Sequence, residues 1–210
     1  DDTDRSDNKM HSYQSEKIVI DTTTPVIHVT YGNQDVKRTE GSRLYFDRTQ
    51  TATIQITEHN FRADDVAAEV TAVDVTGRNV AVADYAAYLS SRGNWKKDGD
   101  VYTATITYPV DANYIFDISY HDLALNEAAD YTPDLFTVDQ TVPDNLSISY
   151  SEGVQQQRVG VTPFRYYNQM MTVTIAGEDA TSGIEHFVYN YRNASGVSAV
   201  NAQLLEAAIE

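Results

Sequence analysis

The sequence predicts an all-β protein, built from antiparallel two-sheet β-sandwiches arranged in tandem. Two observations lead to this prediction. The 210-residue chain has 15 tyrosines among abundant threonine and valine, and aromatic and β-branched residues favour strands. The chain also contains an internal repeat, without the regular strand–helix–strand alternation that is typical of parallel sheets.

The repeat is visible as two ordered matches. Ile18–Pro25 recurs as Phe136–Pro143 at an offset of 118 residues, and Tyr45–Ile54 recurs as Tyr166–Ile175 at an offset of 121. Because both matches occur in the same order at nearly the same offset, we interpret them as copies of one structural unit.

A short helix is predicted in each copy as a third, weaker match. Apolar residues at helical spacing are Tyr85, Tyr88 and Leu89 in the first copy and Leu204, Leu205 and Ala208 in the second. Asp84 and Asn201 precede these groups, and Asp and Asn are favoured helix N-caps. In the first copy the helix lies before the loop that contains Trp95.

The repeat sets the expected domain boundaries. Residues 1–20 are a polar leader that ends in Lys17–Ile20, which we expect to be the last strand of an upstream unit. Residues 21–140 form one complete unit. Residues 141–210 form the first part of a second unit, which is truncated. A partial sandwich leaves a sheet edge and an apolar face exposed.

Alternating runs predict the strands of the complete unit, which are Val26–Tyr31, Thr51–Thr57, Glu69–Val75, Val101–Tyr108, Tyr114–Tyr120 and Leu135–Val138. Asp98-Gly99 before the fourth run is a hairpin signal. Two interpretations of Tyr114 are open. It is either a core aromatic only, or the corner tyrosine of an immunoglobulin-like sandwich, whose hydroxyl bonds to the backbone upstream. Trp95 is either a core residue or an exposed platform for a sugar.

Several motifs resemble one class of proteins. The segments are Asp21–Pro25, Thr53–Phe61, Tyr120–Asn126 and Asp179–Ile184. They resemble the tandem immunoglobulin-like repeats of large surface proteins from Gram-positive bacteria, over roughly residues 17–210. The chain differs from the family pattern at Thr24, where the linker has alanine, and at Leu125, where a turn has glycine.

The resemblance implies a structural function. We expect a stalk or spacer of a secreted or cell-wall-anchored bacterial surface protein, outside the cell, that projects a distal module. Its partners would be neighbouring repeats of the same chain. The alternatives are an adhesin module that binds a glycan or host protein directly, and an accessory domain of a secreted carbohydrate-active enzyme.

Composition and motifs exclude other classes. The net charge of −16 disfavours nucleic-acid binding, which needs a basic surface. No apolar run reaches the ~18 residues of a membrane span. The chain has no cysteine, which excludes disulfides and thiolate chemistry. It also lacks the common nucleophile, zinc-protease and phosphate-loop motifs, so we do not expect an enzyme or an organic cofactor.

One group of oxygen-bearing residues suggests a metal site. In an immunoglobulin-like sandwich three loops meet at one pole, and on the expected strands they carry Asp21, Glu58, Asp122 and Asn126. Oxygen ligands of this kind suit Ca²⁺. The alternative is that Asp21, Asp122 and Asn126 cap turns through hydrogen bonds to the backbone. A zinc site that uses His59 and His121 is the weaker hypothesis, since no third ligand is apparent.

Overall fold

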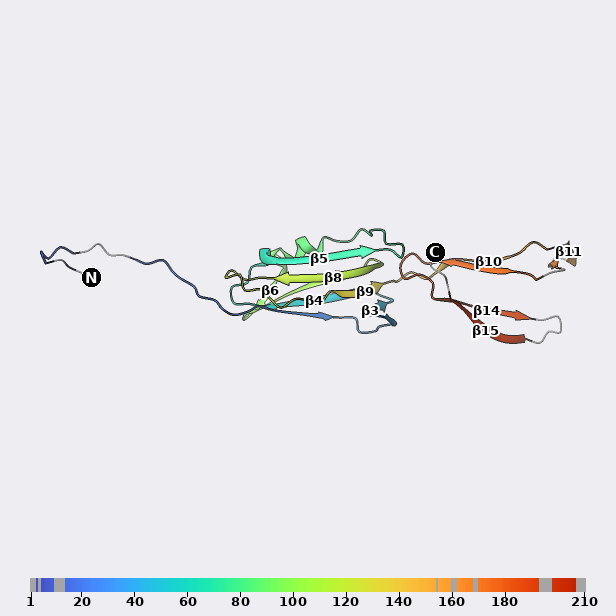
Figure 1. The fold of residues 1–210 in the computed structure, drawn as a ribbon, viewed down its shortest axis with the longest axis horizontal. Helices are drawn as coiled ribbons and strands as arrows, with labels where there is room; N and C mark the ends of the chain where they lie inside the picture. Colours follow the sequence, from blue (N-terminus) through green and yellow to red (C-terminus); the bar gives the residue numbers. More distant parts are fainter. Residues whose placement is uncertain are drawn as a thin grey trace.

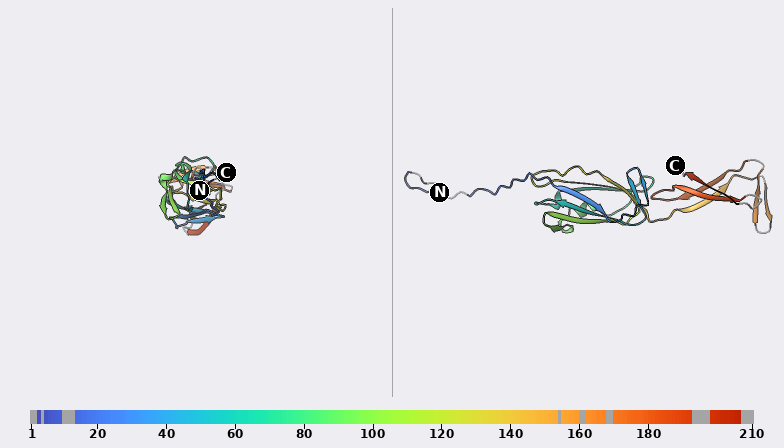
Figure 2. Two further views of the ribbon diagram at one scale, coloured as in Figure 1. Left: turned by 90° about the vertical axis from the view of Figure 1, so that its left-hand side faces the viewer. Right: turned by 90° about the horizontal axis from the view of Figure 1, so that it is seen from below.

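The computed structural model describes residues 3, 5–9, 14–153, 155–159, 162–167, 170–192 and 198–206. Strands make up 46% of the chain and helices 7%, which confirms the all-β prediction. The molecule is elongated, and the strands after residue 141 continue beyond one end of the sandwich formed by residues 21–140 (Figures 1 and 2). Among the helices described, none is long and apolar enough to cross a membrane.

Two sheets pack face to face in residues 21–140. The first has the order β1-β4-β7-β6 and contains β1 (Val26–Tyr31), β4 (Gln50–Thr57), β7 (Val101–Tyr108) and β6 (Lys96–Asp98). The second has the order β2-β3-β9-β8-β5 and contains β2 (Arg38–Glu40), β3 (Arg43–Phe46), β9 (Asp134–Val138), β8 (Ala112–Tyr120) and β5 (Val66–Val73). Neighbouring strands are antiparallel, except that β3 pairs with β9 in parallel.

The core forms because alternate residues of the central strands point inward. On β8 the inward residues include Tyr114, Phe116 and Ile118, each at most 2% exposed. Tyr114 meets Tyr108 of the opposite sheet edge-on, with 5.0 Å between ring centroids. Each buried side chain of this size stabilises the fold by ~1.5–3 kcal/mol, so this aromatic cluster contributes much of what holds the two sheets together.

Both open questions about aromatic residues have an answer in the structure. The Tyr114 hydroxyl donates to the Val110 carbonyl oxygen at 2.7 Å, so Tyr114 is a core residue and also ties the corner before β8. Trp95 is 4% exposed, and its indole Nε1 donates to the Leu89 carbonyl oxygen at 2.7 Å. Trp95 therefore belongs to the core and presents no surface for a sugar to stack on.

A helix, α1 (Tyr85–Leu89), lies between β5 and β6. The Asp84 carboxylate accepts a hydrogen bond from the Ala87 N–H and so caps its first turn. Two short 3₁₀ turns complete the unit, η1 (Ala63–Asp65) and η2 (Arg92–Asn94). Gly99 has a φ of 60° between β6 and β7, as the Asp-Gly hairpin signal predicts.

The strand predictions for this part of the chain differ from the structure in three respects. β5 begins at Val66 rather than Glu69 and ends at Val73, because all eight of its residues pair with β8. The short strands β2, β3 and β6 follow no strict alternation and were not predicted. Lys17–Ile20 forms no strand, and its three apolar side chains are at least 77% exposed, since a strand needs a pairing partner and the described residues provide none there.

The described residues after 141 form three two-stranded antiparallel pairs. They are β10 (Asp144–Tyr150) with β13 (Val173–Glu178), β11 (Gln155–Val159) with β12 (Thr162–Tyr166), and β14 (His186–Arg192) with β15 (Ser198–Glu206). The second predicted helix is wrong over residues 201–206, which belong to β15 and pair with β14. Ala208 lies outside the described residues.

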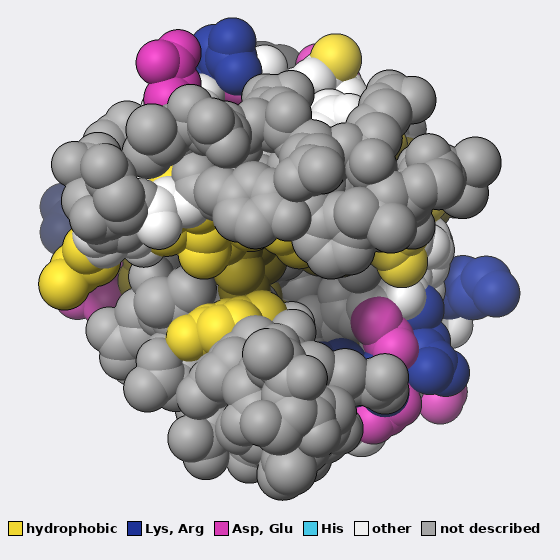
Figure 3. Space-filling model, turned by 90° about the vertical axis from the view of Figure 1, so that its right-hand side faces the viewer, with side chains coloured by type: hydrophobic (Ala, Val, Ile, Leu, Met, Phe, Trp, Pro, Cys, Tyr) yellow, Lys and Arg dark blue, Asp and Glu magenta, His cyan; other side chains and the backbone are white. Residues whose placement is uncertain are grey.

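This second part exposes apolar side chains. Leu146 and Ile148 of β10 are 70% and 54% exposed, and Val188 of β14 is 62% exposed. Figure 3 shows hydrophobic side chains along a hollow at this end of the molecule. The β10–β13 pair therefore contributes little to a closed core among the residues described.

Candidate functional site

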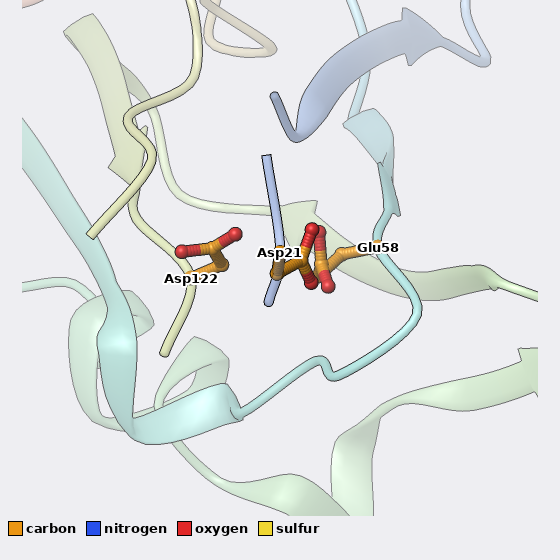
Figure 4. Close-up of side chains that lie close together, drawn as sticks. All are labelled: Asp21, Glu58 and Asp122. Carbon is orange, nitrogen blue, oxygen red and sulfur yellow. The ribbon is translucent and has the colours of Figure 1, made fainter. Parts of the chain in front are cut away.

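The structure brings three of the candidate ligands together at one pole of the first sandwich. Asp21 precedes β1, Glu58 follows β4 and Asp122 follows β8. One carboxylate oxygen from each lies within 4.8 Å of the others. In Figure 4 Asp21 lies between Asp122 and Glu58. Glu58 and Asp122 are only 3% and 1% exposed, so two of the three acidic residues are buried.

Asn126, the fourth candidate, ties the loops rather than pointing an oxygen at the cluster. Its side-chain Nδ2 donates to the Asp21 carbonyl oxygen at 3.1 Å and to Asp122 Oδ2 at 2.8 Å. The nitrogen of the amide therefore faces the carboxylates. Asn126 holds the segment before β1 against the loop after β8.

Asp122 organises that loop from within. Its Oδ1 accepts hydrogen bonds from the Ala124 and Asn126 N–H groups, both at 2.8 Å. Burial by itself raises the pKa of the Asp122 carboxyl, but hydrogen bonds from the Asn126 side chain and from these two N–H groups outweigh it and hold the pKa below its ordinary value. The turn-capping role expected for Asp122 is confirmed.

The same loop contains a strained residue. Leu125 has a φ of 65° and a side chain that is 74% exposed. This left-handed backbone conformation favours glycine, so leucine occupies the turn at a cost in conformational energy.

Asp21 and Glu58 are joined through Asn60. The Asn60 Nδ2 donates to Asp21 Oδ2 at 3.2 Å, and the Asn60 N–H donates to Glu58 Oε1 at 2.7 Å. Asp21 Oδ1 also accepts from the Thr23 N–H at 3.0 Å. Asn60 was not among the four candidate ligands; its position two residues after Glu58, in a loop rich in Asx-turn residues, is the signal that indicates a role.

The chemistry of the cluster follows from its charge. In the part of the chain that the structure describes, no ion pair includes any of the three carboxylates. Three carboxylates this close repel one another unless a cation or hydrogen-bond donors offset the charge. Asn60 and Asn126 supply donors, and a Ca²⁺ ion would supply a charge. Both the metal hypothesis and the capping hypothesis fit the geometry.

The histidines do not join this cluster. His59 Nδ1 lies 3.0 Å from Asp100 Oδ1, and both side chains are exposed. His121 forms an isolated bridge with Glu127. The group Asp21, Glu58 and Asp122 is the sole set of three or more potential ligands found among the described residues, so the zinc hypothesis has no geometric support there.

The opposite end of the first sandwich contacts the second unit through the loop Asp179–Gly183. The Val75 N–H donates to the Ala180 carbonyl oxygen at 3.0 Å, and Asn113 Nδ2 donates to the Thr181 carbonyl oxygen at 2.8 Å. Asn113 is itself oriented, because its Oδ1 accepts from Thr137 Oγ1 at 2.6 Å. Thr181 is 8% exposed. The contact is therefore specific and closely packed.

Gly183 is required by this contact for two reasons. Its φ of 74° is a left-handed conformation, and a Cβ added there would lie 3.3 Å from Val75 Cγ2. Its N–H, together with those of Thr181 and Ser182, donates to Asp179 Oδ1 at 2.8–3.1 Å. One carboxylate thus folds the loop that faces the first sandwich.

The linker between the units is held by Asp111. Its Oδ2 accepts from Thr141 Oγ1 at 2.6 Å, and its Oδ1 accepts from the Gln140 N–H at 3.0 Å. Burial raises the pKa of the nearby Asp139 carboxyl, and the Asp179 and Asp111 carboxylates raise it further, although hydrogen bonds from Ser182 and Thr141 oppose this. The linker is thus hydrogen-bonded on both sides.

The two ends of the first sandwich are related by the repeat. Asp139 stands 118 residues after Asp21, and Asp179 stands 121 residues after Glu58. In the second copy the Ser182 N–H donates a hydrogen bond to Asp139 Oδ2 at 3.2 Å. In the first copy Asp21 accepts a hydrogen bond from the Asn60 side chain instead. Two of the three loops at the pole around Asp21 therefore correspond in sequence to segments that lie at the junction between the units. Comparison with protein-family models and with curated proteins finds no match to this chain.

Proposed function

We propose that residues 21–210 are stalk repeats of a secreted or cell-wall-anchored bacterial surface protein, in which immunoglobulin-like units project a distal module. The observation that supports this most is the junction between the units. A linker that is hydrogen-bonded to Asp111 and a loop that is hydrogen-bonded to Val75 and Asn113 restrain rotation between neighbours. A spacer needs this property, because a flexible linker would let the chain fold back.

Two features of the first sandwich support the immunoglobulin-like assignment. The strand β3 pairs in parallel with β9 within an otherwise antiparallel sheet, and Tyr114 ties the corner before β8 through Val110. The acidic composition, with a net charge of −16, keeps such units soluble and apart from one another. The buried Trp95 removes the main argument for direct sugar binding.

The distance distribution between two spin labels tests the proposed rigidity. Because the chain has no cysteine, the exposed pair Thr105→Cys on β7 and Thr174→Cys on β13 labels one site in each unit. Pulsed electron paramagnetic resonance should give a single narrow distribution. Asn113→Ala and Gly183→Ala should each broaden it, since they remove a hydrogen bond and the close backbone approach at the junction.

The matched control is Asn126→Ala, which removes a tie at the opposite pole and should leave the width of the distribution unchanged. A broad distribution of label-to-label distances in the chain with an unaltered junction would show that the units move independently. The spacer proposal would then be wrong. Equal widths in all variants would remove the assigned role of Asn113 and Gly183.

A further inference from the structure

The segment Lys17–Ile20 carries three large apolar side chains that the first sandwich leaves in solvent. Ile18, Val19 and Ile20 are 83%, 77% and 86% exposed. β-Branched residues favour strands, but among the described residues no strand pairs with this segment. The segment extends from the end of the first sandwich that is opposite to the second unit (Figures 1 and 2). It therefore has the composition of a strand without having a pairing partner there.

The repeat shows what a copy of this segment does elsewhere in the chain. Ile18–Ile20 corresponds to Phe136–Val138, which are the last three residues of β9. In the first sandwich these three residues are at most 2% exposed. They pair in parallel with Leu44–Phe46 of β3. The copy of the exposed segment is thus a buried strand where a β3 edge is available.

The second unit contains a copy of that β3 edge. At the 121-residue offset of the repeat, Leu44–Phe46 corresponds to Arg165–Tyr167, at the end of β12. The antiparallel pair β11–β12 corresponds to the pair β2–β3. β3 has β2 on one side and β9 on the other, whereas in the described part of the chain β12 pairs with β11 alone. The edge that β9 occupies on β3 is therefore open on β12.

The second unit also exposes an aromatic side chain where β9 packs in the first sandwich. The ring of Phe136 meets the ring of Tyr31 edge-on, with 5.5 Å between centroids. Tyr150 holds the position of Tyr31 in the corresponding pair β10–β13, and it is 47% exposed. A strand placed on β12 in the way that β9 lies on β3 would bring Ile18, the copy of Phe136, to this ring.

We propose that Lys17–Ile20 of one chain pairs in parallel with β12 in a second copy of this chain, with Ile18 opposite Arg165 and Ile20 opposite Tyr167. Added strands of this kind gain main-chain hydrogen bonds and bury alternate side chains. The segment and β12 lie at opposite ends of the molecule, with the first sandwich between them (Figures 1 and 2). The contact is therefore head-to-tail, and its repetition produces open chains of molecules rather than a closed dimer.

Sedimentation equilibrium of the full chain tests whether the association occurs. The mean mass should rise above the 23.4 kDa of one chain as the concentration increases from about 10 to about 500 μM, the range expected for a small interface. The net charge of −16 makes the copies repel one another, so raising the salt from about 0.05 to about 0.5 M should strengthen the association. A mass of one chain under all these conditions would overturn the proposal.

Two double variants test whether the segment is responsible. Ile18→Ser with Ile20→Ser should weaken the association by about tenfold or more, because two apolar side chains are no longer buried. Both residues are exposed in the single chain, so the fold should be unaffected. Leu123→Ser with Val142→Ser is the matched control, since these side chains are 58% and 78% exposed and lie outside the segment; it should associate like the unaltered chain. Equal weakening in both double variants would indicate unspecific apolar contact and would also overturn the proposal.

A mixed sample tests the register and the acceptor strand. One chain carries a nitroxide at Thr22→Cys, just after the segment, and the other is ¹⁵N-labelled and has no cysteine. The nitroxide should broaden the amide resonances of Thr162–Tyr166 and leave those of Arg38–Glu40 sharp, because β2 lies in the first sandwich, away from β12. Broadening confined to other strands would show that the copies associate elsewhere. The spacer proposal is tested by distances within one chain, so the two proposals can fail separately.

Discussion

The Tyr114 hydroxyl donates a hydrogen bond to the Val110 carbonyl oxygen at 2.7 Å, across the corner that joins β7 to β8. The ring of Tyr114 is fully buried against Tyr108 and Phe136. Burial raises the pKa of Tyr114 well above its ordinary value, so the hydroxyl stays protonated and remains a donor over the working pH range. The same side chain therefore contributes to the core and fixes the corner.

Tyr114→Phe should lower the free energy of unfolding by about 1–2 kcal/mol, because it leaves the Val110 carbonyl without its partner while keeping the ring. Urea denaturation measures this change. Tyr88→Phe is the control, since the Tyr88 side chain is 40% exposed and its hydroxyl is not needed at a corner; its effect should stay within about 0.5 kcal/mol. If both variants lower the free energy of unfolding by similar amounts, the Tyr114 hydroxyl has no special role and the residue contributes through the packing of its ring alone.

Leu125→Gly should stabilise the first sandwich by about 0.5–1 kcal/mol. The φ of 65° at Leu125 costs about 1–2 kcal/mol for a residue with a Cβ, and part of the gain is offset by the greater freedom of glycine in the unfolded chain. Leu123→Gly is the matched control in the same loop. Leu123 is also exposed but has no positive φ, so this change should not stabilise. A loss of stability in Leu125→Gly would contradict the strain argument.

The calcium hypothesis predicts a thermal melting temperature that is higher in millimolar Ca²⁺ than in EDTA. A ligand at 100 times its dissociation constant stabilises a fold by about 2.7 kcal/mol, which is easily measured. Glu58→Gln should abolish the difference, whereas Glu69→Gln on the exposed face of β5 should preserve it. Superimposed melting curves in Ca²⁺ and EDTA would support the capping hypothesis, under which hydrogen-bond donors of the protein offset the charge without a metal ion.

A stability term that depends on pH is expected from Asp74. Hydrogen bonds from the Thr76 hydroxyl and from the Arg78 and Thr76 N–H groups lower the pKa of Asp74 from 3.8 to about 2. Because the folded pKa is below the unfolded value, the ionised form stabilises the fold above pH 3.8, and this contribution is lost as the pH falls through about 2. The difference in melting temperature between the unaltered chain and Asp74→Asn should therefore shrink between these values. A difference in melting temperature that stays constant over this pH range would contradict the assigned role of Asp74.

Much of the first sandwich can be predicted from local pattern. β7 and β8 alternate strictly, so their inward faces can be read from the sequence, and Asp84 marks the start of α1 in the same way. β3 and β6 escape this reasoning, since three or four residues are too few to show a period and their pairing with β9 and β7 decides their conformation. The residues 201–206 show the same limit, because a short apolar run fits either a helix or a strand.

For the candidate site, the sequence by itself determined which residue types stand after β4 and β8 and before β1, and that those before β1 and after β4 have counterparts about 120 residues later. Only the tertiary structure decided that Asp21, Glu58 and Asp122 converge within 4.8 Å and that Asn126 turns its nitrogen toward them. Spacing along a chain specifies the order of loops but not the distance between their tips. That distance depends on how the two sheets pack, which is a property of the whole core.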